Sequence, residues 1–472
     1  MENHCAICAL AGSLVKARLL VLFLPFIFAI HLSGQNAPAL PPDGGGAYQV
    51  DSGPCLSAVQ RAEIAAGLVA NTAALAREGK LPPVSRSVVQ FDWPVQMAPG
   101  LGWNNFYTVN NFVDHELVAG VREYECGQRT YDGHLGIDID LWPYPWYQKE
   151  NNLARVVAAA PGVIIGKEDG NQDESCSWGN GGAWNAIYIR HADGSAAWYG
   201  HLKRNSLTAK PVGASVAKGE YLGIVASSGY STWPHLHFEV YRAEPYVYDN
   251  LIDPYWGECN FTNFESWWAD QQPYRQPTVN AVLTHNAPPE IGCVQDENPY
   301  FSDYFTPGDM AYAAVYFRDQ LQGMVSTLRI RTPNGAIWNE WTHISPEDYT
   351  SSWWYWGIGL PTSGPFGTWS FEVTFNNETH AHFFEYESLV STASVEASPV
   401  AVFPNPARET LSIQGLQERP VIVEIYSAAG QLLFRQEAGE EGIRLSGLAP
   451  GMYLVKIMAG EAVYTSRVVK AD

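Results

Sequence analysis

Most of the chain alternates hydrophobic and polar residues with a period of two, in short segments separated by glycine, proline, asparagine and aspartate. Three such stretches are RVVAAAPGVIIGKEDG, NAIYIRHADGSAAWYGHL and GEYLGIVASSGYSTWPHLHFEVYR. Alternation of this kind, punctuated by turn residues, is typical of β-strands joined by tight turns. The pattern therefore predicts a mainly β, antiparallel protein.

One segment near the amino terminus has a different pattern. The stretch CLSAVQRAEIAAGLVANTAALAREGKLPP is rich in alanine, and Ser57 and Gln60 have the spacing of a helix capping box. Gly79 and Pro82 mark the end of the segment. We expect one short amphipathic helix here, with three apolar residues toward a core: Ile64, Leu68 and Leu75.

The second half of the chain divides into three blocks. Residues 276–387 contain the strand-like segments AYAAVYFRD, STLRIRTPNGAIW and GTWSFEVTF, which favour a β-sandwich. Residues 388–399 are small and polar, as in a linker. Residues 400–472 form a last block with further short strands.

Composition and charge narrow the class of protein. The chain has 472 residues, of which 46% are hydrophobic and only 16% charged, as expected of several folded domains. The formal net charge is -21, and no cluster of lysine and arginine is present. Because phosphate binding needs such clusters, no nucleic-acid partner is expected.

The first 34 residues have the organisation of a secretory signal peptide. Lys16 and Arg18 precede an apolar run of 12 residues, 19–30, which is followed by small and polar residues. The alternative is a membrane anchor, but this run is interrupted by Pro25 and is shorter than the roughly 20 residues that a span needs. We therefore expect export and no stable membrane span.

Seven cysteines are present, and Cys5 and Cys8 would leave with the signal peptide. The remaining five are Cys55, Cys126, Cys176, Cys259 and Cys293. Scattered cysteines in an exported chain indicate disulfides rather than a zinc cluster. Because five is an odd number, at least one thiol stays free, and the pairing is open.

Two strand-like segments carry candidate metal ligands. In STWPHLHFEV, His235 and His237 fall on one face of a strand, and in YDGHLGIDIDL, His134 and Asp138 also share one face. Either pair alone is more often ordinary solvated surface. Together they offer imidazole nitrogen and carboxylate oxygen, a donor set that suits zinc, and three protein ligands leave a fourth position for water, as in catalytic sites.

These motifs occur in an order that resembles one family. The set HLGID, then YGHL, then GIVASSGYSTWPHLHFEV, with VVAAAPGVIIG and AIYIRHADGS between them, is similar to the lysostaphin-like zinc metallopeptidases, which include many peptidoglycan endopeptidases. The resemblance covers about residues 130–245 and implies an antiparallel peptidase core at residues 121–260. It implies one Zn²⁺ per catalytic domain, held by His134, Asp138 and His237, with His201 and His235 as the catalytic pair.

The activity implied is hydrolysis of peptide bonds, with peptidoglycan stem or cross-bridge peptides as the first substrate class. One histidine would accept the proton of a metal-activated water and the pair would stabilise the oxyanion. Which histidine is the base stays open, and Glu239 would orient a ring or lie at a solvated rim. Alternatives are an extracellular protease of Gly-rich or other proteins, or an inactive wall-binding scaffold of the same fold.

One residue departs from the family pattern, and one motif is a decoy. Trp233 stands where a small residue is usual, so it would narrow a subsite or stack on substrate. The polar stretch KEDGNQDESCSWGNGGAWN is expected to be a loop bordering the groove.

His380 and His382 repeat the spacing of the histidine pair, but no HxxxD accompanies them, so an ordinary strand face is expected.

The last block, residues 400–472, resembles the carboxy-terminal sorting domains of the type IX secretion system. The pieces VFPNPA, AAGQ and LAPGMYLVKI carry this resemblance. It implies that the type IX machinery is a partner and that the protein is secreted or displayed at the cell surface. The alternative is one more adhesion-type β-sandwich.

Residues 35–120 form an amino-terminal segment that precedes the peptidase motifs. Its helix and the Asn-rich stretch GWNNFYTVNNF would either complete the fold or cover the zinc, with an Asn carbonyl in the place of the water. The covering role is a hypothesis at this level.

Overall fold

The computed structural model describes residues 38–48, 53–85, 88–116, 118–178, 181–388, 400–415, 421–427, 432–438, 442–460 and 462–471. The expected signal peptide and most of the expected linker lie outside these ranges. No helix among the described residues is long and apolar enough to cross a membrane.

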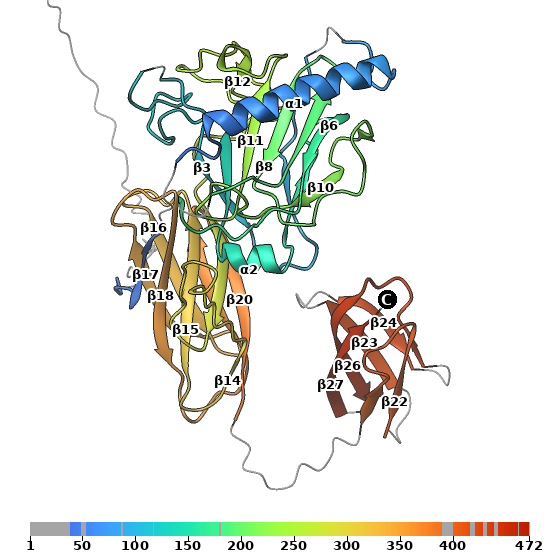
Figure 1. The fold of residues 1–472 in the computed structure, drawn as a ribbon. Coiled ribbons are helices and arrows are strands. Elements are labelled where there is room, and N and C mark those ends of the chain that lie inside the picture. The colour runs from blue at the N-terminus through green and yellow to red at the C-terminus, as the bar shows by residue number, and fades with distance from the viewer. Residues whose placement is uncertain are drawn as a thin grey trace, which may run out of the picture. The chain divides into compact units, whose positions relative to one another are not determined.

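The peptidase-like region is built on one large sheet, antiparallel in its registers, with strand order β3-β4-β11-β8-β7-β6-β9 and β12 paired to β11 (Figure 1). Its strands are β3 (Tyr107–Asn111), β4 (Ile137–Leu141), β6 (Gly162–Glu168), β7 (Ala186–His191), β8 (Ala196–Gly200), β9 (Ser215–Val216), β11 (His235–Tyr241) and β12 (Leu251–Ile252). A smaller sheet has the order β10-β5-β2, with β2 (Val95–Met97), β5 (Ala154–Val157) and β10 (Tyr221–Ile224). The mainly β, antiparallel expectation is confirmed.

The amino-terminal helix forms where the sequence predicts it. Helix α1 (Ala58–Arg77) begins at Ser57, whose side chain accepts the backbone N–H of Gln60, while the Gln60 side chain accepts the backbone N–H of Ser57. This reciprocal capping satisfies two N–H groups that a helix start otherwise leaves free. Helix α2 (Pro145–Glu150) and a 3-10 helix, η2 (Tyr248–Asn250), are shorter.

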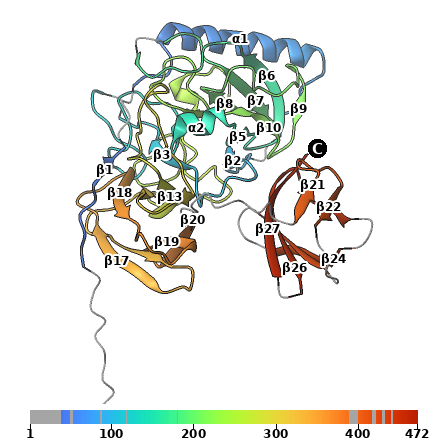
Figure 2. The same cartoon turned by 90° about the horizontal axis from the view of Figure 1, so that it is seen from below.

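The two faces of the large sheet have different neighbours. Ile137, Ile139, Leu236 and Phe238 join a core that also contains residues of the small sheet. The opposite face packs a second core, in which Leu68 and Leu75 of α1 contact residues such as Ile165 and Trp198. Figures 1 and 2 both show α1 lying along this second face. Strand alternation therefore places α1 on the same side of the sheet as His237 and Asp138.

Strands β2 and β3 belong to these sheets although they lie inside the expected amino-terminal segment 35–120. β2 pairs with β5, and β3 pairs with β4. Only the part of that segment before β2 is therefore separate from the sheets of this region. Residues 38–48 include β1 (Gly44–Ala47), which pairs with β18.

The next region contains two sheets whose inward residues form one core, as in a β-sandwich. One sheet has the order β1-β18-β15-β13, with β13 (Thr278–His285), β15 (Met310–Arg318) and β18 (Ser351–Gly359). The other has the order β14-β20-β19-β16-β17, with β14 (Tyr304–Phe305), β16 (Val325–Arg331), β17 (Ile337–Ile344), β19 (Gly367–Phe375) and β20 (Glu378–Tyr386). Asn280 of β13 donates hydrogen bonds of 2.9 Å to the carbonyls of Tyr107 and Trp142.

The carboxy-terminal region has its own core and two small sheets. The first has the order β21-β22-β25, formed by β21 (Ala401–Phe403), β22 (Thr410–Gln414) and β25 (Ile443–Arg444). The second has the order β24-β23-β26-β27, formed by β23 (Val421–Ser427), β24 (Leu432–Glu437), β26 (Gly451–Ala459) and β27 (Ala462–Lys470).

Four of the five expected mature cysteines are paired. Disulfides join Cys126 to Cys259 and Cys176 to Cys293, and Cys55 remains a buried thiol. The Cys126–Cys259 bridge spans 133 residues, and all five predicted site residues lie within this closed loop.

Replacing both Cys126 and Cys259 by serine is expected to lower the free energy of unfolding by about 2–5 kcal/mol, because the unfolded chain regains the freedom of a long loop. Urea denaturation followed by tryptophan fluorescence measures this difference. Wild-type protein with its disulfides reduced should shift in the same direction. An unchanged midpoint in the double variant would contradict the prediction.

Candidate active site

The register of three neighbouring strands brings the predicted site together. Strand β11 lies between β4 and β8, with His237 opposite Asp138 on one side and opposite Gly200 on the other. His235 is opposite Asp140. Because Leu236 and Phe238 point into the core, His235 and His237 point to the other face, beneath the segment that contains α1.

His134, Asp138 and His237 meet at one carboxylate oxygen. Oδ1 of Asp138 lies 3.2 Å from Nε2 of His134 and 2.8 Å from Nδ1 of His237. The two imidazole nitrogens are 3.3 Å apart. All three residues are buried. We call these three residues the ligand triad.

The other ring nitrogens of the triad are already occupied. Nδ1 of His134 donates to the Phe112 carbonyl at 2.7 Å, and Nε2 of His237 donates to Glu239 at 2.7 Å. The remaining nitrogens face Asp138, either as donors of a proton or as lone-pair donors to a metal. Three such polar atoms so close together in a buried place repel one another unless a proton or a metal cation lies among them. The donor set of two imidazoles and one carboxylate fits zinc.

The predicted catalytic pair lies beside the triad. His201 follows β8 with a φ of 63°, in the left-handed region, and its ring lies 4.3 Å from the ring of His235. Nδ1 of His201 donates to the Ser228 carbonyl at 2.6 Å, and Nδ1 of His235 donates to the Trp233 carbonyl at 2.7 Å. In the described structure both Nε2 atoms are buried and have no hydrogen-bond partner. Two oriented rings therefore each present one unused nitrogen.

A shell of polar groups fixes the triad. Asn111 donates to Oδ2 of Asp138 at 2.9 Å. Glu239, which is fully buried, accepts two hydrogen bonds from Arg61 at 2.7 and 2.8 Å and one from Tyr241 at 2.7 Å. The geometry favours the orienting role of Glu239 over a solvated rim, because such partners fix the tautomer of a metal-binding histidine.

The charges of the buried carboxylates follow from their neighbours. Burial opposes ionisation of Asp138, but the imidazoles of His134 and His235 hold its pKa well below the ordinary value. Burial likewise opposes ionisation of Glu239, and Arg61 overrides it and lowers that pKa. Burial raises the pKa of Asp140 to about 8, although the charge of His235 partly opposes this. Burial and the charge of His235 lower the pKa of His201.

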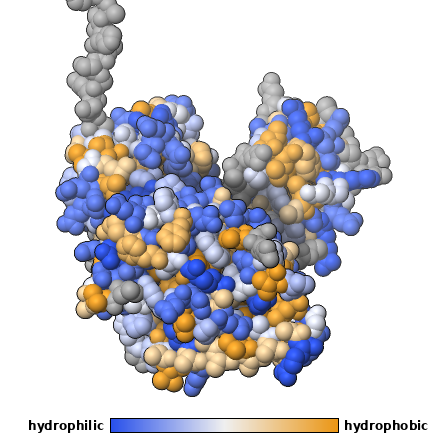
Figure 3. Space-filling model, turned by 90° about the horizontal axis from the view of Figure 1, so that it is seen from above, coloured by the Kyte–Doolittle hydropathy of each residue, from blue (hydrophilic) through white to orange (hydrophobic). Residues whose placement is uncertain are grey.

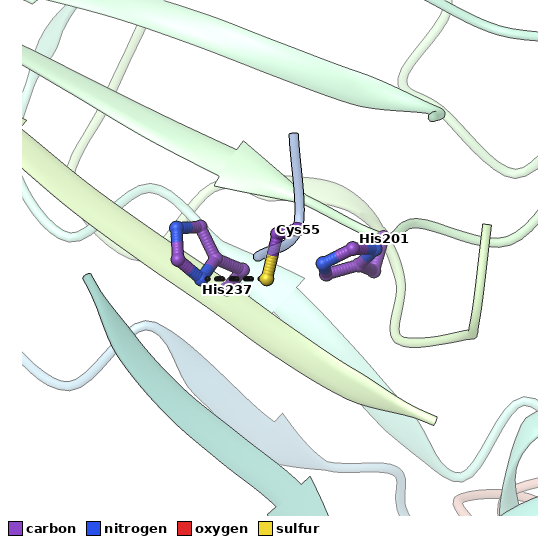
Figure 4. Close-up of side chains that lie close together, drawn as sticks. All are labelled: Cys55, His201 and His237. Atoms are coloured by element: carbon purple, nitrogen blue, oxygen red, sulfur yellow. Dashed lines mark hydrogen bonds between the residues drawn. The ribbon is translucent and has the colours of Figure 1, made fainter. Parts of the chain in front are cut away.

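The site also contains a residue that the sequence analysis did not place there. Sγ of Cys55 lies 3.5 Å from Nδ1 of His237 and 3.4 Å from the hydroxyl of Tyr131. Figure 4 shows the thiol between the rings of His237 and His201. The odd number of cysteines indicated a free thiol, but nothing local to Cys55 pointed to the metal ligands.

The Asn-rich stretch has a different role from the one considered. Asn111 contributes its amide nitrogen to Asp138, and Asn104 and Asn105 donate backbone N–H groups to the carbonyl of Asn280. The segment before β2 brings the sulfur of Cys55, rather than an asparagine carbonyl, to 3.5 Å from Nδ1 of His237.

Trp233 and the two decoy histidines, His380 and His382, each have identified neighbours in the structure. Trp233 is buried and packs against Tyr48, with ring centroids 4.4 Å apart. His380 and His382 lie on β20 near Glu378 and Asp303 respectively. Among the described residues, the groups of close metal-binding side chains include neither of these two histidines.

The surface seen from above mixes hydrophilic and hydrophobic residues. Figure 3 shows hydrophilic residues interspersed with hydrophobic patches, one of which runs along the lower edge of the view. The exposed apolar residues of α1 include Val59, and exposed loops nearby include Phe261 and Phe264.

Comparison with known proteins identifies two regions. Residues 133–253 match the model of Peptidase family M23, and residues 401–471 match that of the Secretion system C-terminal sorting domain. A segment of 59 residues is 46% identical to the DD-carboxypeptidase/endopeptidase Mpg of Neisseria meningitidis and to that of Neisseria gonorrhoeae. It covers 12% of this chain and 13% of each of these relatives, so the match spans only a small part of their length.

Parts of the chain are also similar to solved structures. A mutant catalytic domain of the prophage-encoded M23 protein EnpA from Enterococcus faecalis is 26% identical, covering 34% of this chain and 95% of that chain with a TM-score of 0.21. Lysostaphin from Staphylococcus simulans is 18% identical, covering 58% of this chain and 88% of that chain with a TM-score of 0.22. Residues 133–253 therefore match a peptidase family M23 domain and residues 401–471 match a secretion sorting domain, and the second match indicates a secreted or cell-surface protein.

Proposed function

We propose that this protein is a secreted zinc metalloendopeptidase that hydrolyses peptide bonds in peptidoglycan stem or cross-bridge peptides. The observation that carries the proposal is the buried ligand triad with two unused histidine nitrogens beside it. The family match at residues 133–253 supports a peptidase, and the sorting domain supports an extracellular substrate. The type IX machinery would be the partner in export.

His134, Asp138 and His237 would hold one zinc ion. When bound at such a site, zinc polarises a carbonyl and lowers the pKa of a water molecule toward neutrality. Glu239 would keep the ring of His237 in the tautomer that leaves Nδ1 free. The carbonyl of Phe112 would keep the ring of His134 in the tautomer that leaves Nε2 free.

His201 and His235 would act on the proton and on the developing charge. Nε2 of one ring accepts the proton of the attacking water, and that proton later reaches the leaving amine. The other ring, when protonated, donates a hydrogen bond to the oxyanion of the tetrahedral intermediate. The carbonyls of Ser228 and Trp233 hold both rings with Nε2 directed into the site.

The regions of the chain would divide this work. Residues 121–260 would form the peptidase, 276–387 a separate β-sandwich, and 400–472 the export signal. The segment before β2 would cover the site until export is complete. The fold elements described above are the basis for this division.

Replacing His237 by alanine is expected to lower zinc affinity by more than about 100-fold, because the site loses a direct ligand. Zinc per chain after dialysis, measured by mass spectrometry of the metal, tests this. His380→Ala is the matched control, since His380 occupies the same HxH spacing outside the triad and should leave zinc content unchanged. Equal zinc in both variants would place the metal elsewhere.

Replacing His201 or His235 by alanine is expected to leave zinc bound and to lower kcat by about 10²–10⁴-fold, the usual contribution of general acid–base groups. Zinc content and peptide hydrolysis should be measured on the same preparations. Loss of zinc together with activity would show that these residues are ligands rather than catalytic groups.

The substrate class is tested by incubating the purified protein with peptidoglycan and, separately, with a Gly-rich protein. Samples with and without a chelator, and before and after limited trypsin digestion, should be compared by mass spectrometry of new amino termini. Chelator-sensitive ends in wall peptides, absent in His237→Ala, are expected. Cuts confined to the protein would indicate an extracellular protease, and no cuts under any condition would indicate an inactive scaffold.

A further inference from the structure

A single thiol lies against the ligand triad and the catalytic pair at once. Sγ of Cys55 is within 4.8 Å of ligand atoms of His201 and His237, and it forms a second such group with Asp138 and His235. Cys55 is only 4% exposed, and the hydroxyl of Tyr131 is its nearest oxygen partner, at 3.4 Å. The thiol is therefore inside the site rather than at its edge.

The position of the sulfur corresponds to the open side of the triad. The triad leaves one coordination position unfilled, and the unused Nε2 atoms of His201 and His235 lie around the same space. Both nitrogens are buried and have no hydrogen-bond partner in the described structure. The space beside them therefore favours a polar atom over an apolar one. Water or a substrate carbonyl would have to occupy this place, and Cys55 stands in it (Figure 4).

The chain around Cys55 is anchored from both sides. After Cys55, the capped helix α1 packs Leu68 and Leu75 against the second core, and Asn71 donates to the Ile165 carbonyl at 3.0 Å. Before it, Tyr48 stacks on Trp142 with ring centroids 4.6 Å apart and packs on Trp233. The thiol is thus held over the triad by contacts that do not involve the sulfur.

One ion pair connects this segment directly to a metal ligand. Arg61 of α1 binds both oxygens of Glu239 at 2.7 and 2.8 Å, and Glu239 accepts a hydrogen bond from Nε2 of His237. The Arg61 side chain is 21% exposed and that of Glu239 is fully buried. Loss of this pair would leave a buried carboxylate without its main partner, so α1 and the triad stabilise each other.

We propose that Cys55 is the fourth ligand of the zinc, as a thiolate, and that residues 38–80 keep the peptidase latent until they are removed. The inference rests on the proposed zinc site. Thiolate sulfur is among the preferred ligands of zinc, and with two imidazoles and one carboxylate it completes four-coordination. A closed site of this kind has no place for the reacting water.

Activation is an exchange of ligands. Release of the segment would withdraw the sulfur of Cys55 from the site, leave its position to a water molecule, and leave a thiol that takes its proton from solvent. No oxidant or reductant is consumed. The chain also has a place for the cut that would drive this exchange, because residues 76–80 and 82–85 are exposed and include Arg77 and Lys80.

A cut in this stretch would free the segment from the peptidase. Both disulfides join cysteines beyond it, namely Cys126, Cys259, Cys176 and Cys293. Strands β2 and β3, which the sheets need, also lie beyond it. Residues 38–80 are therefore held only by noncovalent contacts once the chain is cut.

The first test uses the full-length exported protein loaded with Co²⁺ in place of zinc. The wild type should show the near-ultraviolet charge-transfer absorption of a thiolate bound to cobalt, and Cys55→Ser should lose this band while still binding one cobalt ion. Ser57→Ala, which weakens the cap of α1 but keeps the sulfur, is the matched control and should keep the band. Cobalt bound in the wild type without the band would overturn the proposal.

A second measurement does not depend on a variant that folds. X-ray absorption at the zinc edge of the wild type should detect one sulfur at about 2.3 Å. After trypsin cleavage near Lys80 and removal of the released segment, that sulfur should be replaced by oxygen or nitrogen. A shell of nitrogen and oxygen alone in the uncut protein would overturn the proposal.

Activity gives a separate readout. Cleaved protein should hydrolyse the substrate at least on the order of tenfold faster than uncut protein, since only uncovered molecules react. Equal rates before and after release of the segment would overturn latency while leaving the zinc peptidase intact. Failure of the wild type to bind cobalt or zinc at all would overturn the proposed function, and this inference with it.

Discussion

Three polar atoms within hydrogen-bond distance of one another, buried at Oδ1 of Asp138, are the constraint around which the peptidase region is organised. Such an arrangement is unfavourable unless a positive charge neutralises it, either a proton on an imidazole or the metal cation of the proposed function. Hydrogen bonds with Phe112, Asn111 and Glu239 hold the side chains of His134, Asp138 and His237 in this arrangement.

Because side chains alternate along each strand, the large sheet places core residues on one face and the predicted site residues on the other. Leu236 and Phe238 point into a core with the small sheet, while His235 and His237 point to the opposite face. That opposite face is also apolar away from the triad, because α1 covers it with Leu68 and Leu75. One element therefore both completes a core and lies over the reactive groups.

Helix α1 is therefore connected to His237, one of the proposed metal ligands, through a chain of hydrogen bonds. Arg61 contributes the cation that Glu239 needs, and Glu239 fixes the ring of His237. When the segment leaves, Glu239 must find solvent or another partner, although Tyr241 remains bonded to it. In the proposed latent and released forms, the hydrogen bond from His237 to Glu239 would therefore differ in strength.

Local patterns in the sequence determined the strands, the capped helix and the faces that His134 shares with Asp138 and His235 shares with His237. The family resemblance, not a local pattern, implied that these residues meet and that His201 joins them. Alternation and capping depend on neighbouring residues, so they can be inferred from the chain itself. The disulfide partners and the position of Cys55 could not, since Cys55 is 182 residues from His237 and reaches it only because α1 packs on the sheet. That approach is a property of tertiary packing, which places groups in contact without any local signal.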